Sequence, residues 1–324
     1  MLGKVSPDDL AAHVFQRNGA DLESVRQGPA YGEDAAAIDV PGGTLVVSSD
    51  PLWFAVDRVG TLGVHVACND VAASGGDPTW MNTVVLLPAD ADSATLERVM
   101  TQVDEAAESL GVAVVGGHSE YNQQIDRPLL MMTCMGMGSP YVPTGGANPG
   151  DELILTEGAA IEGTAILASD FEAELRERGV DPALIETGVG FFEDIGVTEE
   201  GAVLREFATG MHDPTEGGLI DALLEMASAS EASIEVDPGA VPIREATAVL
   251  TEAMGIDPLR TFGSGALLAA VPGPELDDAL SALAEADIEA AHIGSVVEGT
   301  PATLMLGEEE FTEPVRDDMY SLWE

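Results

Sequence analysis

The sequence is poor in cysteine, lysine and aromatic residues. Its 324 residues include two cysteines (Cys68 and Cys134), one lysine (Lys4) and 5% aromatic residues. Two cysteines exclude a disulfide-rich scaffold and a zinc site built mainly of thiolates. Both cysteines lie in apolar stretches, which predicts that they are small, buried hydrophobic side chains.

Long apolar runs are also missing from the sequence. No run reaches the roughly 18 residues of a membrane-spanning helix, so no such helix is expected. The first ten residues carry charges and a proline but no apolar segment, so no signal peptide is expected either. Hydrophobic residues still make up 45% of the chain, enough for a large core, and the length predicts about two domains.

Positive charge is scarce along the whole chain. Twelve basic residues stand against 58 acidic ones, which gives a formal net charge of −46. This balance excludes nucleic-acid binding through a basic face and argues against an anionic membrane surface as a partner. Because the acids are spread out rather than gathered in a tail, we interpret them as the solvated surface of a protein from a salt-rich cytoplasm. A specific cation-binding protein is the alternative.

The apolar pattern of the first half predicts strands with two intervening helices. The expected elements are, in order, a strand pair at Asp39–Ser49, a helix at Val59–Ser74, a strand at Met81–Leu87, a helix from Asp92 or Ser93 to Gly111, and strands at Val112–Val115 and Leu129–Met137.

The second half again predicts an α/β or α+β arrangement. The expected elements are a strand at Glu152–Thr156, helices at about 159–169, 198–208 and from Thr215, a strand at Ala266–Val271, a helix at Pro274–Ala286 and a strand at Ile288–Val297. Turn-forming residues cluster between Pro143 and Gly150, so we place the domain boundary there, with domains of residues 1–145 and 146–324.

Common local motifs for nucleotide binding and hydrolysis do not occur. The sequence has no P-loop, no dinucleotide-binding glycine fingerprint and no Gly-x-Ser-x-Gly elbow. Its five histidines are far apart, so no His-x-x-x-His zinc helix is present. What remains is a series of acidic residues beside glycines, at the expected ends of strands and helices.

This acidic series suits a metal-bound phosphate. Its members are Gly32–Ala36, Ser49–Pro51, Asn69–Asp70, Gly116–Glu120 and His212–Gly218. Magnesium prefers hard oxygen ligands, and a glycine-flanked helix start offers free amides to a phosphate. The series therefore predicts a metal–nucleotide site without a P-loop. Taken alone, each carboxylate is more simply a turn or cap residue, Gly116–Gly117 a tight turn and His118 a hydrogen-bonded loop histidine.

The same segments, in the same order, resemble the AIR synthase-related family over nearly the whole chain. The most specific ones are Asn-Asp-x-x-x-x-Gly-x-x-Pro at Asn69–Pro78 and Asp-Pro-Thr-x-Gly-Gly at Asp213–Gly218. Gly146–Asp151 and Gly263–Leu268 add to the resemblance. The family includes aminoimidazole ribonucleotide synthase, the hydrogenase-maturation protein HypE, thiamine-monophosphate kinase and selenophosphate synthetase.

The resemblance implies a PurM-like, two-domain fold. The N-terminal α/β domain would complete its sheet across a homodimer, the C-terminal domain would be α+β, and ATP would lie between the two domains. The implied Mg²⁺ ligands are Asp34, Asp50 and Asp70, and the implied cofactor-binding positions are Asn69, Gly116, Gly117, Ser119, Thr215, Gly217 and Gly218. The implied catalytic positions are Asp213 and His118, which stands where several branches have an acidic residue.

Within the family, HypE-like spacing fits best. The sequence ends in Ser321–Glu324, however, without the cysteine that receives the carbamoyl group in HypE. The expected activity is therefore Mg-ATP-dependent phosphoryl transfer to an amide or carbonyl oxygen of an unidentified small substrate, by an enzyme that is not itself a carbamoyl carrier. A thiamine-monophosphate kinase-like enzyme and a non-catalytic, nucleotide-binding regulatory dimer are the alternatives.

The stability of the folded protein is expected to rise with salt. A net charge of −46 repels itself in the compact state, and the Debye length falls from about 10 Å at 0.1 M salt to about 3 Å at 1 M. The midpoint of thermal unfolding, followed by circular dichroism, should therefore increase between about 0.1 and 2 M KCl. A midpoint that stays level or falls would contradict our interpretation of the surface.

Overall fold

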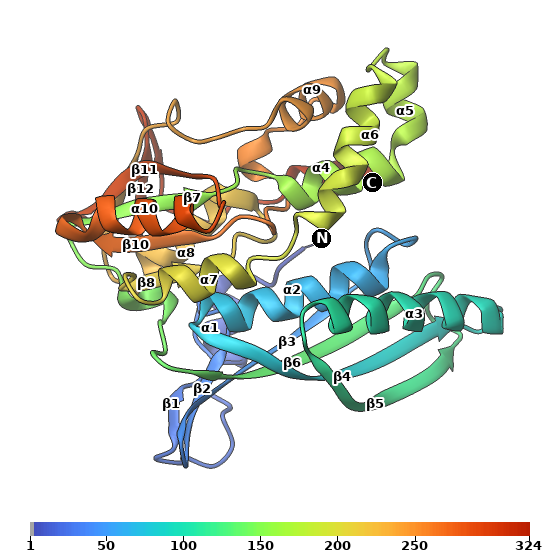
Figure 1. Ribbon diagram of the computed structural model, residues 1–324, viewed down its shortest axis with the longest axis horizontal. Helices are drawn as coiled ribbons and strands as arrows, with labels where there is room; N and C mark the ends of the chain where they lie inside the picture. The colour runs from blue at the N-terminus through green and yellow to red at the C-terminus, as the bar shows by residue number, and fades with distance from the viewer. Residues whose placement is uncertain (1–2) are drawn as a thin grey trace.

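The chain folds around two β-sheets, one from each half of the sequence. The computed structural model describes residues 3–324. Figure 1 shows α2 (Val59–Ala73) and α3 (Ser93–Ser109) on one face of the N-terminal sheet, with the C-terminal half beyond them. The opposite face of the N-terminal sheet has no helix on it in this view.

The N-terminal sheet has six strands in the order β1-β2-β3-β6-β4-β5. They are β1 (Val25–Gln27), β2 (Ala36–Val40), β3 (Gly43–Leu52), β4 (Gly76–Pro88), β5 (Ala113–Asn122) and β6 (Leu129–Gly138). β4 and β5 are parallel and are connected by α3, whereas the other neighbours are antiparallel. β6 is the last of these strands in sequence, yet it lies between β3 and β4.

The ends of α3 follow from its sequence. Asp92 accepts a hydrogen bond from the Thr95 amide at 2.9 Å, which caps the first turn. Val99 and Val103, four residues apart, are buried on one side of the helix, as expected for an amphipathic helix on a sheet. Gly111, with φ of 69°, follows the last turn in the left-handed conformation that favours glycine.

α2 is buried on all sides. Thirteen of its fifteen residues are buried, and these include the polar Asn69 and Asp70. A helix that is apolar around its circumference is stable only between two layers. β3 and β6 supply one layer and α7 (Thr198–Leu204) of the C-terminal half supplies the other. α7 approaches so closely that a Cβ on Gly201 would lie 2.7 Å from the carbonyl oxygen of Ala72.

The C-terminal sheet has seven strands in the order β13-β12-β9-β11-β7-β10-β8. They are β7 (Asp151–Thr156), β8 (Gly210–His212), β9 (Ser233–Val236), β10 (Leu268–Pro272), β11 (Ala290–Val297), β12 (Thr303–Leu306) and β13 (Glu309–Phe311). Side chains alternate along β7, so Leu153 and Leu155 pack with α8 (Gly218–Ala229), whereas Ile154 packs with α10 (Leu276–Glu285). The two helices therefore cover opposite faces.

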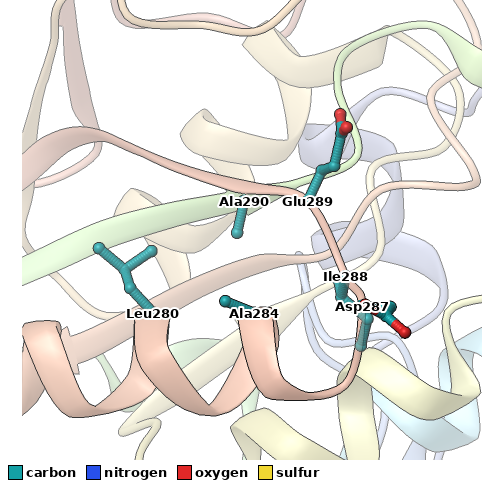
Figure 2. A pocket seen from close by; sticks show the side chains of 6 residues that line it. All are labelled: Leu280, Ala284, Asp287, Ile288, Glu289 and Ala290. Atoms are coloured by element: carbon teal, nitrogen blue, oxygen red, sulfur yellow. The ribbon is translucent and has the colours of Figure 1, made fainter.

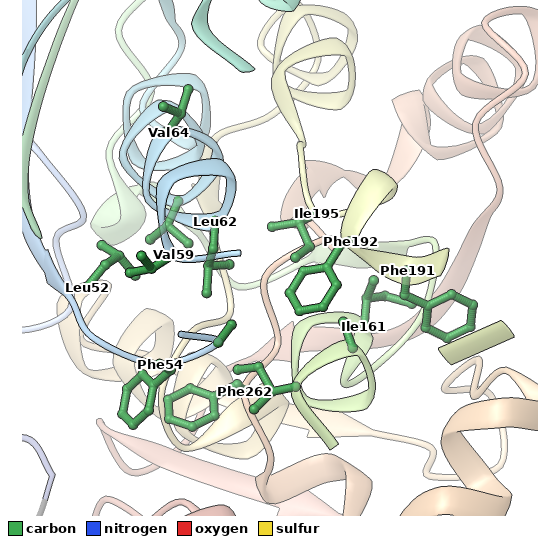
Figure 3. Packing of buried hydrophobic residues seen from close by; sticks show 14 of the residues in the cluster. Leu52, Phe54, Val59, Leu62, Val64, Ile161, Phe191, Phe192, Ile195 and Phe262 are labelled. Carbon is green, nitrogen blue, oxygen red and sulfur yellow. The ribbon is translucent and has the colours of Figure 1, made fainter. Parts of the chain in front are cut away.

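Four further helices lie beside this sheet and share a core with the N-terminal half. They are α4 (Ile161–Asp170), α5 (Glu172–Glu177), α6 (Pro182–Gly190) and α9 (Glu245–Met254). Figure 3 shows residues of the shared core, with Phe54 beside Phe262. The ring centroids of Phe54 and Phe262 are 4.9 Å apart. One continuous apolar cluster thus joins the two halves of the chain.

The structure confirms much of the predicted element order. The strand pair, both helices of the first half and the strands at Met81–Leu87 and Leu129–Met137 are present, as are the mixed α/β character and the two sheets. The sheets are joined by residues 139–150, which contain the predicted boundary between residues 145 and 146. That boundary, taken as a limit of folding units, stays a prediction. In residues 3–324, no helix combines the length and the apolar character needed to cross a membrane.

Several predicted element ends are wrong. Gly116–Glu120, expected in a loop, lies inside β5, and Asp50, expected at a strand end, lies inside β3. β5 is an edge strand whose residues are almost all exposed, so it lacks the apolar pattern that identifies a strand. The helix expected from Thr215 begins at Gly218. The short helices α5, α6 and α9 were not predicted, and neither were the short strands β8, β9, β12 and β13.

Three buried carboxyl groups of the C-terminal half have raised pKa values. Glu162, Glu200 and Asp317 are 4%, 6% and 1% exposed, and burial is the main cause that raises the pKa of each to about 7. A folded state with such a group keeps a proton that the unfolded chain releases. Stability therefore falls as the pH rises from the ordinary glutamate pKa of 4.5 to about 7.

Glu162→Gln is expected to stabilise the protein at neutral and higher pH. The substitution removes the cost of ionising a buried acid, so the gain in unfolding free energy should be on the order of 2 kcal/mol larger at about pH 8 than at about pH 5. Urea titrations in about 2 M KCl would measure it. Glu174→Gln, at an exposed position of α5, is the matched control. An equal gain at both pH values would contradict the assignment of the raised pKa to Glu162.

Candidate functional site

Two carboxyl groups and a hydroxyl meet where α2 lies on β3. Ser48 and Asp50 are two residues apart on β3 and therefore point to the same face, toward Asp70 of α2. The Ser48 Oγ lies 2.9 Å from Asp50 Oδ2 and 2.6 Å from Asp70 Oδ2. The Ser48 hydroxyl therefore bridges the two carboxyl groups. Burial, followed by the charges of Asp50 and Asp34, raises the pKa of Asp70 well above its usual range.

Asp34 is held by a buried histidine from the C-terminal half. His212, the last residue of β8, places Nδ1 2.7 Å from Asp34 Oδ1 and 2.9 Å from Oδ2. Its Nε2 lies 3.0 Å from Oε2 of Glu225 on α8. Burial by itself lowers the pKa of His212, but the carboxylates of Asp34 and Glu225 outweigh it and raise the pKa to about 10. The ring is therefore an imidazolium that bridges two carboxylates at neutral pH.

Asp213 is fully buried, and neither of its carboxylate oxygens has a hydrogen-bond partner among residues 3–324. Its backbone N–H donates to Asp34 Oδ2 at 3.2 Å. Burial, followed by the charges of Asp34 and Glu162, raises the pKa of Asp213 well above its usual range. A buried carboxyl group without partners is costly, so this position marks a place where a ligand would supply what the protein does not.

Together these side chains form what we call the aspartate cluster, which consists of Asp34, Asp50, Asp70 and Asp213. The charges of the other three all act on Asp70. The cluster unites the three predicted metal ligands with the predicted catalytic acid, and its members come from four separate segments: the turn before β2, β3, α2 and the turn before α8. Long-range folding, rather than a local motif, therefore creates it.

The aspartate cluster has the oxygen ligands that suit a divalent cation, but its carboxylates do not form a complete coordination site as they stand. Carboxylate oxygens are the ligands that magnesium prefers, and the two free oxygens of Asp213 lack any partner. Within the described residues 3–324, no three His, Cys, Asp or Glu side chains are arranged so that they could hold a metal ion as they stand. Binding would thus draw the carboxylates closer together than they are in this structure.

The glycine turn before α8 is left-handed and is occupied by a carboxylate. Gly217 and Gly218 have φ of 86° and 65°, and a Cβ on Gly218 would lie 2.7 Å from the carbonyl oxygen of Leu259. The Gly217 amide, expected to face phosphate, donates to Asp317 at 3.0 Å. The carbonyl oxygen of Thr215 accepts from the Gly218 amide. A phosphate at this turn would therefore have to displace Asp317.

The Asn69 side chain forms hydrogen bonds that stabilise the fold. Its Nδ2 donates to the carbonyl oxygen of Ile195 at 2.8 Å, and its Oδ1 accepts from the Val197 amide at 2.9 Å. The side chain is completely buried and ties α2 to the segment that leads into α7. A contact between Asn69 and a nucleotide stays a prediction.

The glycines of β5 lie apart from the aspartate cluster within one chain. The strand register places Asp50, Met132, Thr83 and Gly117 in one row across the sheet, so Gly117 is three strand spacings, about 14 Å, from Asp50. Gly117 has φ of 151°, and a Cβ there would lie 1.8 Å from the Thr83 carbonyl oxygen. Close packing of β5 on β4 therefore requires this glycine, whatever else it does.

His118 and its neighbours are exposed on the same edge strand. Alternation along β5 turns His118 away from the face that carries Asp50. Its Nε2 lies 3.2 Å from Glu120 Oε2, and the two side chains are 64% and 57% exposed. Gly116 and Ser119 are exposed as well. Within a single chain, the predicted catalytic role of His118 and the predicted cofactor contacts of β5 are therefore separated from the aspartate cluster, and they stay predictions.

A surface hollow of about 630 Å³ lies elsewhere, at the C-terminal end of α10. Figure 2 shows its lining, which is Leu280, Ala284, Asp287, Ile288, Glu289 and Ala290. None of these residues belongs to the aspartate cluster. The hollow and the aspartate cluster are therefore separate features of the molecule.

Sequence reasoning missed Glu225, although a signal for it existed. Glu225 is the one charged residue between Ala222 and Ala227 of α8, and it lies four residues after Asp221 on the same helix. A carboxylate inside an apolar helix segment is rarely buried without a cation beside it. His212 and the N-terminal segment supply that cation, and Lys4 of that segment lies 221 residues away in sequence, which no local pattern could show.

The two halves of the chain match two known domains. Residues 32–138 match the AIR synthase related protein, N-terminal domain, and residues 148–307 match the AIR synthase related protein, C-terminal domain. The carbamoyl dehydratase HypE of Cupriavidus necator is 31% identical over 296 residues, which cover 86% of this chain and 79% of that protein. The carbamoyl dehydratase HypE of Rhizobium leguminosarum bv. viciae is 30% identical over 284 residues, which cover 82% and 77%.

Solved structures share the fold. A HypE–HypF complex matches with a TM-score of 0.76 at 21% identity, over 95% of this chain and 98% of that chain. HypE in complex with ATP matches with a TM-score of 0.70 at 24% identity, over 98% and 97%. AaThiL complexed with AMPPCP and TMP matches with a TM-score of 0.72 at 20% identity, over 89% and 91%. The expected PurM-like, two-domain fold is confirmed, and the chain belongs to the AIR synthase-related family, within which it is HypE-like.

Proposed function

We propose that this protein is a Mg-ATP-dependent phosphoryl-transfer enzyme that activates an amide or carbonyl oxygen of a small substrate. The observation that carries the proposal is the aspartate cluster, in which Asp213 is buried with both carboxylate oxygens unpartnered. Magnesium-bound phosphates suit such a set of hard oxygen donors. With a single lysine in the chain, a metal ion and backbone amides must supply most of the positive charge that phosphates need.

The four aspartates would hold the magnesium, which when bound supplies the charge that neutralises the phosphates during transfer. His212 fixes the orientation of Asp34 and still leaves lone pairs of that carboxylate free. Burial and neighbouring charges raise the pKa values of Asp70 and Asp213. A cation bound beside them would act in the opposite direction and favour their ionised forms.

The names of related proteins and the ligands of solved structures support ATP-dependent activation of an oxygen. Those most like the chain in sequence include proteins named carbamoyl dehydratase, and a dehydratase must activate an oxygen so that it can leave. Proteins of the same fold have been solved with ATP, in a HypE, and with AMPPCP and TMP, in AaThiL. These ligands belong to those proteins, and they support a nucleotide site in this one.

We propose that the acceptor is a separate small molecule rather than a group carried on a cysteine. Cys68 and Cys134 are both free and completely buried, with their Sγ atoms 3.8 Å apart. A thiol in that position is a poor nucleophile, because its neighbour Cys134 and burial raise the pKa of Cys68 well above its ordinary value. Neither cysteine can therefore serve as the carrier without a large rearrangement.

A non-catalytic, nucleotide-binding protein is the second candidate. Such a protein would bind the nucleotide at the aspartate cluster, while Asp317 keeps the Gly217 amide from the phosphate that would be transferred. Steady phosphate release above a metal-free blank separates the two candidates. A thiamine-monophosphate kinase-like activity is tested directly by adding that substrate.

We also propose that two copies pack through the face of the N-terminal sheet that no helix covers (Figure 1). Trp80 and Met131 lie on this face and are 38% and 37% exposed, with Val84 and Met135 beside them. An uncovered apolar sheet face and an open edge at β5 both favour association. Such a dimer would also cover the exposed side of β5, which carries His118.

Mg-ATP binding should depend on Asp213. Asp213→Asn removes an anionic ligand without breaking a hydrogen bond, so Mg-ATP should bind at least about tenfold more weakly while the fold is kept. Calorimetry in molar KCl, with and without magnesium, measures this. Asp50→Asn should act in the same direction, and Asp90→Asn, at an exposed loop position, is the control. Equal binding by the parent and Asp213→Asn would refute the role of Asp213.

The parent protein should be a dimer at micromolar concentration in high salt, and Met131→Glu should shift it to a monomer. A carboxylate on the uncovered face would have to be buried without a partner in the dimer, which is costly. Light scattering coupled to size exclusion measures both masses. A monomeric parent, or a variant that dimerises as well as the parent, would disprove the proposed interface.

A further inference from the structure

The one lysine of the chain contacts the support of the aspartate cluster. Lys4 precedes α1 (Pro7–His13), and its Nζ lies 2.9 Å from Glu225 Oε1 and 3.5 Å from Asp221 Oδ2. The two carboxylates are four residues apart on α8 and so share a face. The Lys4 amide also donates to Glu216 Oε1 at 2.7 Å. The backbone amide of Lys4 thus binds the turn before α8, and its side chain binds α8 itself.

Glu225 connects this contact to the aspartate cluster. One of its oxygens faces Lys4 and the other faces Nε2 of His212, whose Nδ1 binds Asp34. A carboxylate with each oxygen engaged by a different cation cannot rotate without losing one of its charge-assisted hydrogen bonds. Lys4 therefore fixes Glu225, Glu225 fixes the imidazole plane of His212, and that plane sets the position of the Asp34 carboxylate.

Charge alternates along this row of side chains, in the order Lys4, Glu225, His212 and Asp34. The side chains of Glu225 and His212 are 8% and 3% exposed, whereas that of Lys4 is 40% exposed. Without the ammonium group, the buried carboxylates of Glu225 and Asp221 would lose their nearest cation. Among the described residues 3–324, His212 would then be the only cation beside Glu225. Removing one partner from a buried charge network is strongly disruptive.

We propose that Lys4 is a positioning residue of the site, which holds Asp34 in place for the metal-bound nucleotide through Glu225 and His212. This inference rests on the proposed function, because it assigns Lys4 a role toward the Mg-ATP that the aspartate cluster would bind. Lys4 itself need not touch the nucleotide. The N-terminal segment is thus a fifth segment that builds the site.

The single lysine allows the ammonium charge to be tested on the folded protein. Acetylation removes the charges of Lys4 and of the α-amino group, whereas reductive dimethylation keeps both. The Lys4 variants described below separate the contribution of Lys4 from that of the α-amino group. The probe is the magnesium complex of a non-hydrolysable ATP analogue, measured by calorimetry in molar KCl. Intact-mass spectrometry confirms the modification, and circular dichroism confirms the fold.

Acetylated protein should bind the analogue about tenfold more weakly than unmodified protein, and dimethylated protein within about threefold of it. The matched variants are Lys4→Met, expected to bind weakly, and Lys4→Arg, expected to recover most of the affinity because a guanidinium can pair with both carboxylates. Arg17→Met removes a positive charge from an exposed position of the same segment and should bind like the parent.

Two outcomes would overturn the role of Lys4 without contradicting the proposed function. One is equal affinity of the acetylated and unmodified proteins, and the other is an equal loss in Lys4→Met and Arg17→Met, which would indicate a general charge effect. If the unmodified protein fails to bind the analogue at all, the proposed function fails and the role of Lys4 fails with it. A purely structural role of Lys4 would lower the melting temperature and leave the affinity of the folded protein unchanged.

Discussion

The architecture depends on one helix that must be covered on every side. Because α2 is buried around nearly its whole circumference, the N-terminal sheet alone cannot cover it, and α3 and α7 complete its enclosure. The buried amide of Asn69 fixes the register of that contact through two backbone groups. The same packing brings Asp70, next along α2, against β3 and close to the turn before α8, so the core and the site are built by one contact.

Two cations, Lys4 and His212, lie close to this contact, at the support of the aspartate cluster. Twelve basic residues among 58 acidic ones cannot neutralise the surface, and most of them lie at exposed positions. Beside the aspartate cluster, His212 and Lys4 are aligned with Glu225 between them. The surface charge is screened by salt, whereas charges buried at this depth are screened far less. Salt therefore weakens the repulsion among the surface acids much more than it weakens the interactions of the buried acids.

The aspartates were predictable from sequence because each stands in a segment whose order along the chain resembles the family, and the structure brings Asp34, Asp50, Asp70 and Asp213 together. The sequence singled out Gly117 as a cofactor-binding glycine. In the structure a glycine is required there because the Thr83 backbone of the paired strand leaves no room for a Cβ, and that pairing is a long-range feature. Lys4 and Glu225 are 221 residues apart in sequence, and neither a periodicity nor a local motif can predict a contact between residues so far apart. β5 was shortened in the prediction because an exposed edge strand carries no apolar alternation.

The place of β6 has a consequence for the order in which a nascent chain can fold. β3 and β4 share no hydrogen bonds with each other, because β6 lies between them, so both keep an open edge until Gly138 has been synthesised. During that time the strands of neighbouring nascent chains are available as wrong partners. Because salt screens the carboxylates, their mutual repulsion acts only at short range. The insertion of β6 is therefore what closes both edges at once.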